Sequence, residues 1–146
     1  MKSRSETAVE KMLSGFNCAQ SVFYAFSDLT GIDKNTSLKL ACGFGSGMAY
    51  NQDVCGAVTG GIMVISAIHG RGENDEQSFR DVTYSKVREF TQKFKDEFGS
   101  CDCITLLENC DMKTDEGKKR FKEEGLRDKV CIKVVERAVI LVESLI

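Results

Sequence analysis

The segment of residues 54–69 constrains the fold of this chain more than any other, because it is apolar on nearly all sides. A helix of this kind has to be surrounded by its neighbours, whereas an amphipathic helix lies at a surface. The β-branched residues of the segment would also suit a buried strand, since periodicity alone does not separate the two. Its length and the potential capping residue Asp53 favour a helix, which Gly70 would end.

The rest of the chain has mostly helical periodicity and contains no proline that would interrupt a helix. Apolar residues recur every three or four positions, which predicts amphipathic helices over residues 5–28, 74–98 and 129–146. Residues 113–125 are mostly charged and form either a solvated connector or a marginal helix. We therefore predict an all-α protein with a single domain over residues 1–146, a bundle of four to five helices around the central apolar helix.

The charge balance and the apolar runs argue against several classes of partner. The chain carries 20 Lys and Arg against 22 Asp and Glu, which is not the basic composition of a nucleic-acid-binding protein. Residues 1–11 lack the apolar core of a secretory signal, and the longest apolar run, residues 60–68, is too short to span a membrane. We therefore expect a cytoplasmic protein with no membrane insertion and no nucleic-acid partner.

Several cysteines in a compartment that keeps thiols reduced point to catalysis, redox cycling or metal binding, with plain burial in the core as the alternative. A scaffold stapled by disulfides fits poorly, because the number of cysteines is odd and the chain is long enough to build its own core. No C-x-x-C pair occurs, which argues against a zinc ribbon or a thioredoxin-like site. The fold must assemble any site from widely spaced residues, which are Cys18, Cys42, Cys55, Cys101, Cys103, Cys110 and Cys131.

Cys55 is the candidate reactive thiol, because it follows Asp53 by two residues and so lies in the first turn of the predicted central helix. The unpaired N–H groups and the dipole of a helix favour a thiolate there, which predicts a lowered pKa for Cys55. Gly60 and Gly61 allow another backbone or helix to come close. The glycine-rich loop of residues 43–47 leads toward the same point and could bind an anion, although it lacks the Gly-Lys-Ser/Thr ending of a P-loop.

Five stretches in a fixed order match a known pattern: Phe16-Asn17-Cys18-Ala19-Gln20-Ser21-Val22, Gly43-Phe44-Gly45-Ser46-Gly47-Met48, Cys55-Gly56-Ala57-Val58-Thr59-Gly60, Phe98-Gly99-Ser100 leading to Cys103 and Leu106-Leu107, and Cys131 at the start of the last helix. In these stretches the chain resembles the C_GCAxxG_C_C family of small redox-active proteins over almost its entire length. The resemblance implies that the four family cysteines are Cys18, Cys55, Cys103 and Cys131. It also implies a redox role and an association with a transport process.

The other three cysteines, Cys42, Cys101 and Cys110, are additions to the family pattern. Cys101 could compete with Cys103 for the third family position, but the spacing from Phe98-Gly99-Ser100 favours Cys103.

The first functional hypothesis is a thiol–disulfide redox protein, with oxidoreductase activity toward a redox partner protein or a small thiol. The Cys55 thiolate would attack a disulfide or an oxidant, and Cys18 would resolve the product. Cys103 and Cys131 would form a second pair. This chemistry requires no cofactor.

The alternative hypothesis is a zinc or iron–sulfur site with Cys18, Cys55, Cys103 and Cys131 as ligands. The absence of a close ligand pair, apart from the C-x-C of Cys101 and Cys103, counts against it. A third interpretation is a structural helical domain in which the cysteines only fill space.

Overall fold

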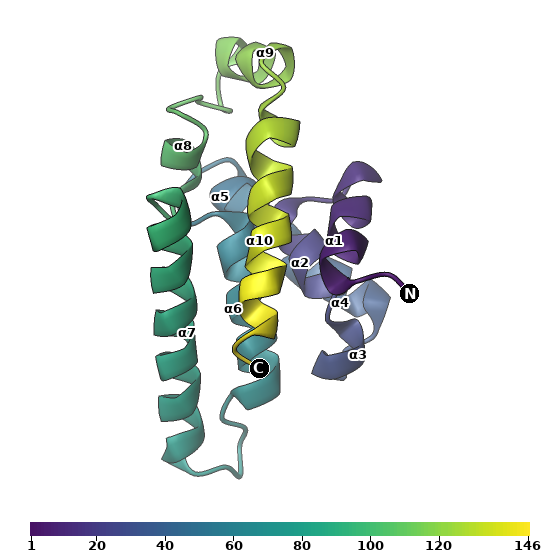
Figure 1. Ribbon diagram of the computed structural model, residues 1–146, viewed down its shortest axis with the longest axis vertical. Coiled ribbons are helices and arrows are strands. Elements are labelled where there is room, and N and C mark those ends of the chain that lie inside the picture. The colour runs from purple at the N-terminus through teal and green to yellow at the C-terminus, as the bar shows by residue number, and fades with distance from the viewer.

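Every regular element is a helix in the computed structural model, which describes residues 1–146 (Figure 1). The predicted all-α fold is therefore confirmed. A 3-10 turn, η1 (Cys42–Phe44), precedes α5, and a π-helical turn, η2 (Arg127–Cys131), precedes α10. The α-helices are α1 (Arg4–Leu13), α2 (Cys18–Tyr24), α3 (Ser27–Thr30), α4 (Lys34–Ala41), α5 (Gly45–Ala49), α6 (Gly56–His69), α7 (Gln77–Phe98), α8 (Cys103–Leu106), α9 (Asp115–Glu123) and α10 (Ile132–Glu143).

Helix α6 lies at the centre of the bundle, as its apolar sequence predicts. It contacts α2, α7 and α10, and Figure 1 shows α10 running along it between α7 and α1. Residues 56–61 are all buried, and so are Val64 and Ile65. The helix begins at Gly56 without a side-chain cap, so the prediction that Asp53 caps it is wrong. Residues 53–55 instead pair with residues 101–103.

The predicted single helix over residues 5–28 is also wrong, because the chain divides there into α1, α2 and α3. Gly15, with a φ of +107°, follows the end of α1. Asn17 then starts α2 with a capping box, in which its side chain accepts from Gln20 N and the Gln20 side chain accepts from Asn17 N. Both α1 and α2 pack on α10, so the apolar spacing continues across the break.

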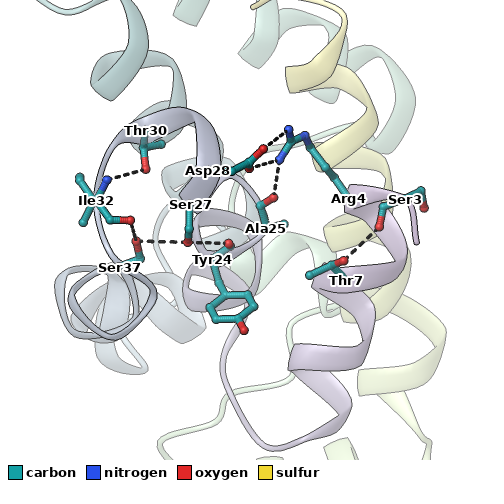
Figure 2. A network of polar contacts seen from close by, with 10 residues as sticks. All are labelled: Ser3, Arg4, Thr7, Tyr24, Ala25, Ser27, Asp28, Thr30, Ile32 and Ser37. Carbon is teal, nitrogen blue, oxygen red and sulfur yellow. Dashed lines mark hydrogen bonds and ion pairs between the residues drawn. The ribbon is translucent and has the colours of Figure 1, made fainter. Parts of the chain in front are cut away.

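A network of polar contacts ties α1 to the turn that follows α2 (Figure 2). The Arg4 guanidinium donates from Nη1 to the carbonyl oxygen of Ala25 (2.9 Å) and from Nη2 to Oδ2 of Asp28 (2.8 Å). On the other side of this turn, the Ser27 hydroxyl donates to the carbonyl oxygen of Tyr24 (2.7 Å). These contacts hold α1 and α3 around α2, the helix that carries Cys18.

The phenylalanines of α7 are unequally buried, and the charged segment after α8 adopts the helical one of its two expected forms. Phe90 and Phe94 are fully buried, but Phe79 is 46% exposed because the first turns of α7 extend past the end of α10 (Figure 1). The charged residues form helix α9, which the Thr114 side chain caps. None of the helices combines the length and the apolar character needed to cross a membrane.

Candidate functional site

Four cysteines from distant parts of the chain line one cavity of about 150 Å³, which we call the four-cysteine cavity. Each of them lies where a helix begins. Cys18 is the first residue of α2, Cys55 directly precedes α6, Cys103 is the first residue of α8, and Cys131 is the last residue of η2 before α10. The structure therefore brings together all four site cysteines that the sequence predicts.

Two glycines of α6 allow α2 to come close beside the cavity. A Cβ atom on Gly56 would lie 3.0 Å from the backbone N of Ala19 and 3.1 Å from Cβ of Cys18. A Cβ atom on Gly60 would lie 2.9 Å from the carbonyl oxygen of Ala19. Since nine in ten real Cβ contacts are longer than these, any side chain here would push α2 away. The prediction that Gly60 lets a second helix come close is confirmed. A Cβ atom on Gly61, the other glycine named in that prediction, would instead lie 2.5 Å from Cζ of Phe90 in α7.

A short antiparallel pairing holds Cys55 and Cys103 at the cavity wall. The backbone N of Cys55 donates to the carbonyl oxygen of Cys101 (2.7 Å), and the backbone N of Cys103 donates to the carbonyl oxygen of Asp53 (2.7 Å). These bonds tie the start of α6 to the start of α8, which are more than forty positions apart in the sequence.

The turn η2 contributes Cys131 together with Arg127 and Val130 to the cavity wall. A π-helical turn is rare, and it occurs often at functional sites. The sequence predicts a regular helix from residue 129, so this turn is a departure from the expected geometry. The π-helical turn ends at Cys131, the residue of this segment whose thiol lines the cavity.

The glycine-rich segment forms another wall, in a left-handed conformation. Residues 46–50 all have positive φ, between 55° and 68°. The left-handed conformation costs roughly 1–2 kcal/mol for each residue other than glycine. Ser46 and Tyr50 from this run line the cavity, which confirms that the loop leads to the same point as Cys55. Gly47 is required, because a Cβ atom there would lie 2.5 Å from Cα of Gln52.

The cavity is apolar except at a few positions. Twelve of its sixteen lining residues are hydrophobic, the cysteines included. Arg127 is the only charged residue among them, and Asn17, Ser46 and Tyr50 supply neutral polar groups. Such a lining excludes water from Cys55 and Cys103. It leaves one cation, Arg127, whose Nε also pairs with Asp128 (3.1 Å).

Cys18 and Cys131 lie next to each other in the four-cysteine cavity. Hydrogen bonding to the Cys131 side chain is the largest of the causes that raise the pKa of Cys18 well above its ordinary value, followed by burial and by charge repulsion from Cys131. Both residues are only partly buried, so this pair is the more accessible part of the cavity.

The prediction of a lowered pKa for Cys55 is wrong. Burial is the largest cause and raises its pKa well above the ordinary value, with repulsion from Cys18 as the next cause. The backbone N–H groups of Ala57 and Val58 do lower the pKa, as expected at a helix start, but by less. Burial likewise raises the pKa of Cys103 to about 11. For a thiol that is 5% exposed, the loss of hydration raises the pKa more than the N–H groups at the helix start lower it.

A zinc or iron–sulfur site would require the four sulfurs to point at one common centre. No group of three or more His, Cys, Asp or Glu side chains is arranged so that it could hold a metal ion. The four thiols share the walls of one cavity without forming a metal site in this conformation.

The three additional cysteines lie outside the four-cysteine cavity. Cys42 is exposed in η1. Cys101 is buried, and its thiol points to the carbonyl oxygen of Thr91 at 3.7 Å, so Cys103 is the one of the two that faces the other family cysteines. Cys110 is 1% exposed and packs in a small apolar cluster with Cys103.

Two residues near the thiols were not predicted from the sequence as part of the site. Tyr50 lines the cavity although nothing in the sequence sets it apart from other surface aromatics. Gln52 is 4% exposed and has a φ of +54°, and its side chain interacts with Cys103 and lowers the pKa of that thiol. The only sequence feature near Gln52 is the group of glycines in residues 43–47, which predicts a turn before it.

The pH dependence of alkylation follows from the burial of these thiols. Near neutral pH, iodoacetamide is expected to label the exposed Cys42 rapidly and Cys55 and Cys103 slowly, because the thiolate is the reactive form. The labelling rate of Cys103 should keep rising until the pH approaches 11. Peptide mass spectrometry of the fully reduced protein measures each rate. A labelling rate of Cys103 that reaches half of its maximum at pH 9.0, the ordinary thiol pKa, would contradict the burial effect.

The same shifts predict how stability changes in alkaline solution. A thiol whose pKa is raised by folding contributes stability that is complete below the ordinary pKa of 9.0, and this contribution is lost as the pH rises toward 11. The reduced protein should therefore lose stability over this window.

Comparisons with known proteins agree with the geometry. A family model described as "Putative redox-active protein (C_GCAxxG_C_C)" matches residues 16–145. A protein of Archaeoglobus fulgidus with the description "Uncharacterized protein" is 27% identical over 139 residues, which cover 90% of this chain and 85% of the relative. No solved structure matches the chain.

Proposed function

Because the chain belongs to the C_GCAxxG_C_C family of redox-active proteins, we propose that it is a thiol-based redox protein that cycles cysteine thiols and disulfides in the four-cysteine cavity. One observation carries this proposal. Cys18 lies beside Cys131 in a cavity that Cys55 and Cys103 also line. Two neighbouring thiols can form a disulfide where their geometry allows it, and two further thiols in the same cavity can exchange with it.

The reaction begins at Cys131, which is only partly buried. Its thiolate attacks one sulfur of a substrate disulfide, forms a mixed disulfide, and releases one half of the substrate. The Cys18 thiolate then attacks the Cys131 sulfur, forms the Cys18–Cys131 disulfide, and releases the other half. The two cysteine protons pass to the two released thiolates. The protein loses two electrons, and the substrate disulfide gains them.

Cys55 and Cys103 act as a second, more buried pair. The Cys55 thiolate attacks Cys18 and frees Cys131 as a thiol, and Cys103 then attacks Cys55 and frees Cys18. Cys55 thus keeps the role of a reactive thiol, but it receives the disulfide from Cys18 rather than from the substrate. The low exposure of Cys55 and Cys103, 5% and 8%, supports this order, since neither sulfur is open to a bulky substrate.

The substrate is a disulfide of a small thiol or of a redox partner protein. The mainly apolar wall favours an uncharged body around the disulfide. Arg127, the only charged lining residue, favours a negative group at its edge.

Disulfide mapping tests the proposal. The fully reduced protein is incubated with oxidised glutathione, quenched in acid, alkylated and digested, and the linked peptides are identified by mass spectrometry. We expect the Cys18–Cys131 disulfide to form first and Cys55–Cys103 to follow. Glutathione attached to Cys42 alone, with no disulfide among the other four, would reject the proposal. Stoichiometric zinc or iron in anaerobically purified protein would favour the metal alternative instead.

A further inference from the structure

We propose that Cys110 is a fifth thiol of the redox site, which takes over the disulfide from Cys55 by pairing with Cys103. This inference rests on the proposed function and adds to it a buried store for the disulfide. Cys110 lies outside the pattern of the four family cysteines and does not line the cavity.

The chain between the two cysteines folds back on itself. After α8, Glu108 and Asn109 both adopt the left-handed conformation, with φ of 53° and 63°. Cys110 N then donates to the carbonyl oxygen of Leu107 (3.0 Å). The reversal places Cys110 in one apolar cluster with Cys103, Leu107, Met112 and Leu126. Repulsion from Cys110 also contributes to the raised pKa of Cys103, after burial and the charge of Cys18.

Gln52 makes hydrogen bonds at both ends of the segment between Cys103 and Cys110. Its backbone oxygen accepts from Ile104 N (3.1 Å), at the start of α8. Its side-chain Nε2 donates to the carbonyl oxygen of Cys110 (2.8 Å), and its Oε1 accepts from Met112 N (2.7 Å). These three hydrogen bonds, two through the side-chain amide of the buried Gln52 and one through its backbone, fix the position of Cys110 relative to Cys103. Leaving any of these groups unpaired would cost free energy.

The surroundings of Cys110 differ from those of the other additional cysteines. Its thiol donates to the carbonyl oxygen of Gly117 (3.1 Å), and the thiolate would face Arg120, whose pKa is raised mainly by Glu124 and to a smaller extent by Cys110. Cys101, by contrast, packs in the main core and not in the cluster of Cys103. Cys110 is therefore the additional thiol that stands beside a family cysteine.

The exchange step needs no oxidant beyond the disulfide already in the site. The Cys110 thiolate attacks the Cys103 sulfur of the Cys55–Cys103 disulfide, so that the Cys103–Cys110 bond forms and the Cys55–Cys103 bond breaks. Cys55 leaves as a thiolate and takes up the proton that Cys110 has lost. The number of disulfides is unchanged, and Cys55 becomes free to accept the next one from Cys18.

The test is disulfide mapping in four proteins: wild type, Cys110→Ser, Cys103→Ser and Cys101→Ser. Each is reduced, oxidised with oxidised glutathione, quenched in acid and alkylated. Cleavage after Glu108 separates the fragment with Cys103 from the fragment with Cys110. We expect these two fragments to be linked in most molecules of the wild type. Cys101 lies on the same fragment as Cys103, so the link must persist in Cys101→Ser and be lost in the other two variants.

The outcomes separate this inference from the proposed function. If Cys18–Cys131 forms in the wild type but the two fragments are never linked, the role of Cys110 is rejected and the proposed function stands. If the fragments become linked and no Cys18–Cys131 disulfide forms at any earlier time point, the proposed function fails. Far-ultraviolet circular dichroism of Cys110→Ser shows whether the variant keeps its helices. If it does not, the persistence of the link in Cys101→Ser and its loss in Cys103→Ser decide the question.

Discussion

Replacing Cys18 with serine is expected to slow the resolution of a mixed disulfide at Cys131 by about a hundredfold or more, because a serine hydroxyl does not attack a disulfide. Cys18 is the cavity thiol that lies beside Cys131, whose side chain is the largest cause of the raised pKa of Cys18. The variant should therefore stop at the first step, with the substrate still bound to Cys131. Cys55 provides the slow residual reaction, since it lies next to Cys18 in the cavity.

The measurement is the time course of glutathione release from oxidised glutathione, with the mass of the quenched protein followed in parallel. The wild type should release two glutathione molecules for each disulfide that it forms. Cys18→Ser should release one and retain the other as an adduct on Cys131. Cys101→Ser is the matched control, because Cys101 is a buried cysteine that does not line the cavity, and its rate should stay within about twofold of the wild type.

The result that would contradict this scheme is a Cys18→Ser variant that releases the second glutathione as fast as the wild type. The resolving thiol would then be Cys55 or Cys103. If the adduct instead accumulated on Cys55, the substrate would enter at Cys55, as the sequence predicts.

The central helix of the fold could be predicted because its burial follows from the residues of its own segment. A segment that is apolar on all sides belongs inside a bundle, and Gly99 ends α7 in the left-handed conformation that the sequence suggests for a glycine at this position. The break between α1 and α2 is equally local in cause, since it lies in the cap formed by Asn17 and Gln20. It escaped prediction because both helices face the same neighbour, α10, and their apolar spacing runs through the turn.

The sequence could predict which cysteines form the site, but not the direction in which the thiol pKa values are shifted. The family pattern and the helix starts point to Cys18, Cys55, Cys103 and Cys131, all of which line the cavity. The thiol pKa depends on burial, which is set by η2, α8 and the left-handed run from other parts of the chain. A sequence reveals the dipole of the helix that follows Cys55, but it does not reveal how much water the other walls remove.

The least predictable contacts are those of Gln52 with Cys110 and Met112, which span 58 and 60 positions. No periodicity or spacing connects residues so far apart, and glutamine is usually exposed. Gln52 is buried because the left-handed run before it turns the chain back toward α8. The conformation of one segment thus decides the surroundings of a thiol in another.

The close approach of α2 and α6 provides a test of how packing controls the thiols. Replacing Gly60 with valine is expected to lower the free energy of unfolding by about 3 kcal/mol, because added bulk in a packed core forces the backbone to shift. The obstacle is the carbonyl oxygen of Ala19, 2.9 Å from the new Cβ atom, which cannot rotate away as a side chain could. The better helix propensity of valine returns only a few tenths of a kcal/mol.

The displacement should also reach the redox chemistry, since α2 carries Cys18 at its first residue. If α2 moves away from α6, the Cys18 sulfur moves relative to Cys55, and transfer of the disulfide between them should slow more than formation of Cys18–Cys131. Urea unfolding of the reduced protein measures the stability, and Ala67→Val, which adds two carbon atoms on the exposed side of α6 where Gly60→Val adds three, is the control. A Gly60→Val protein as stable as this control would show that α2 and α6 do not need a glycine between them.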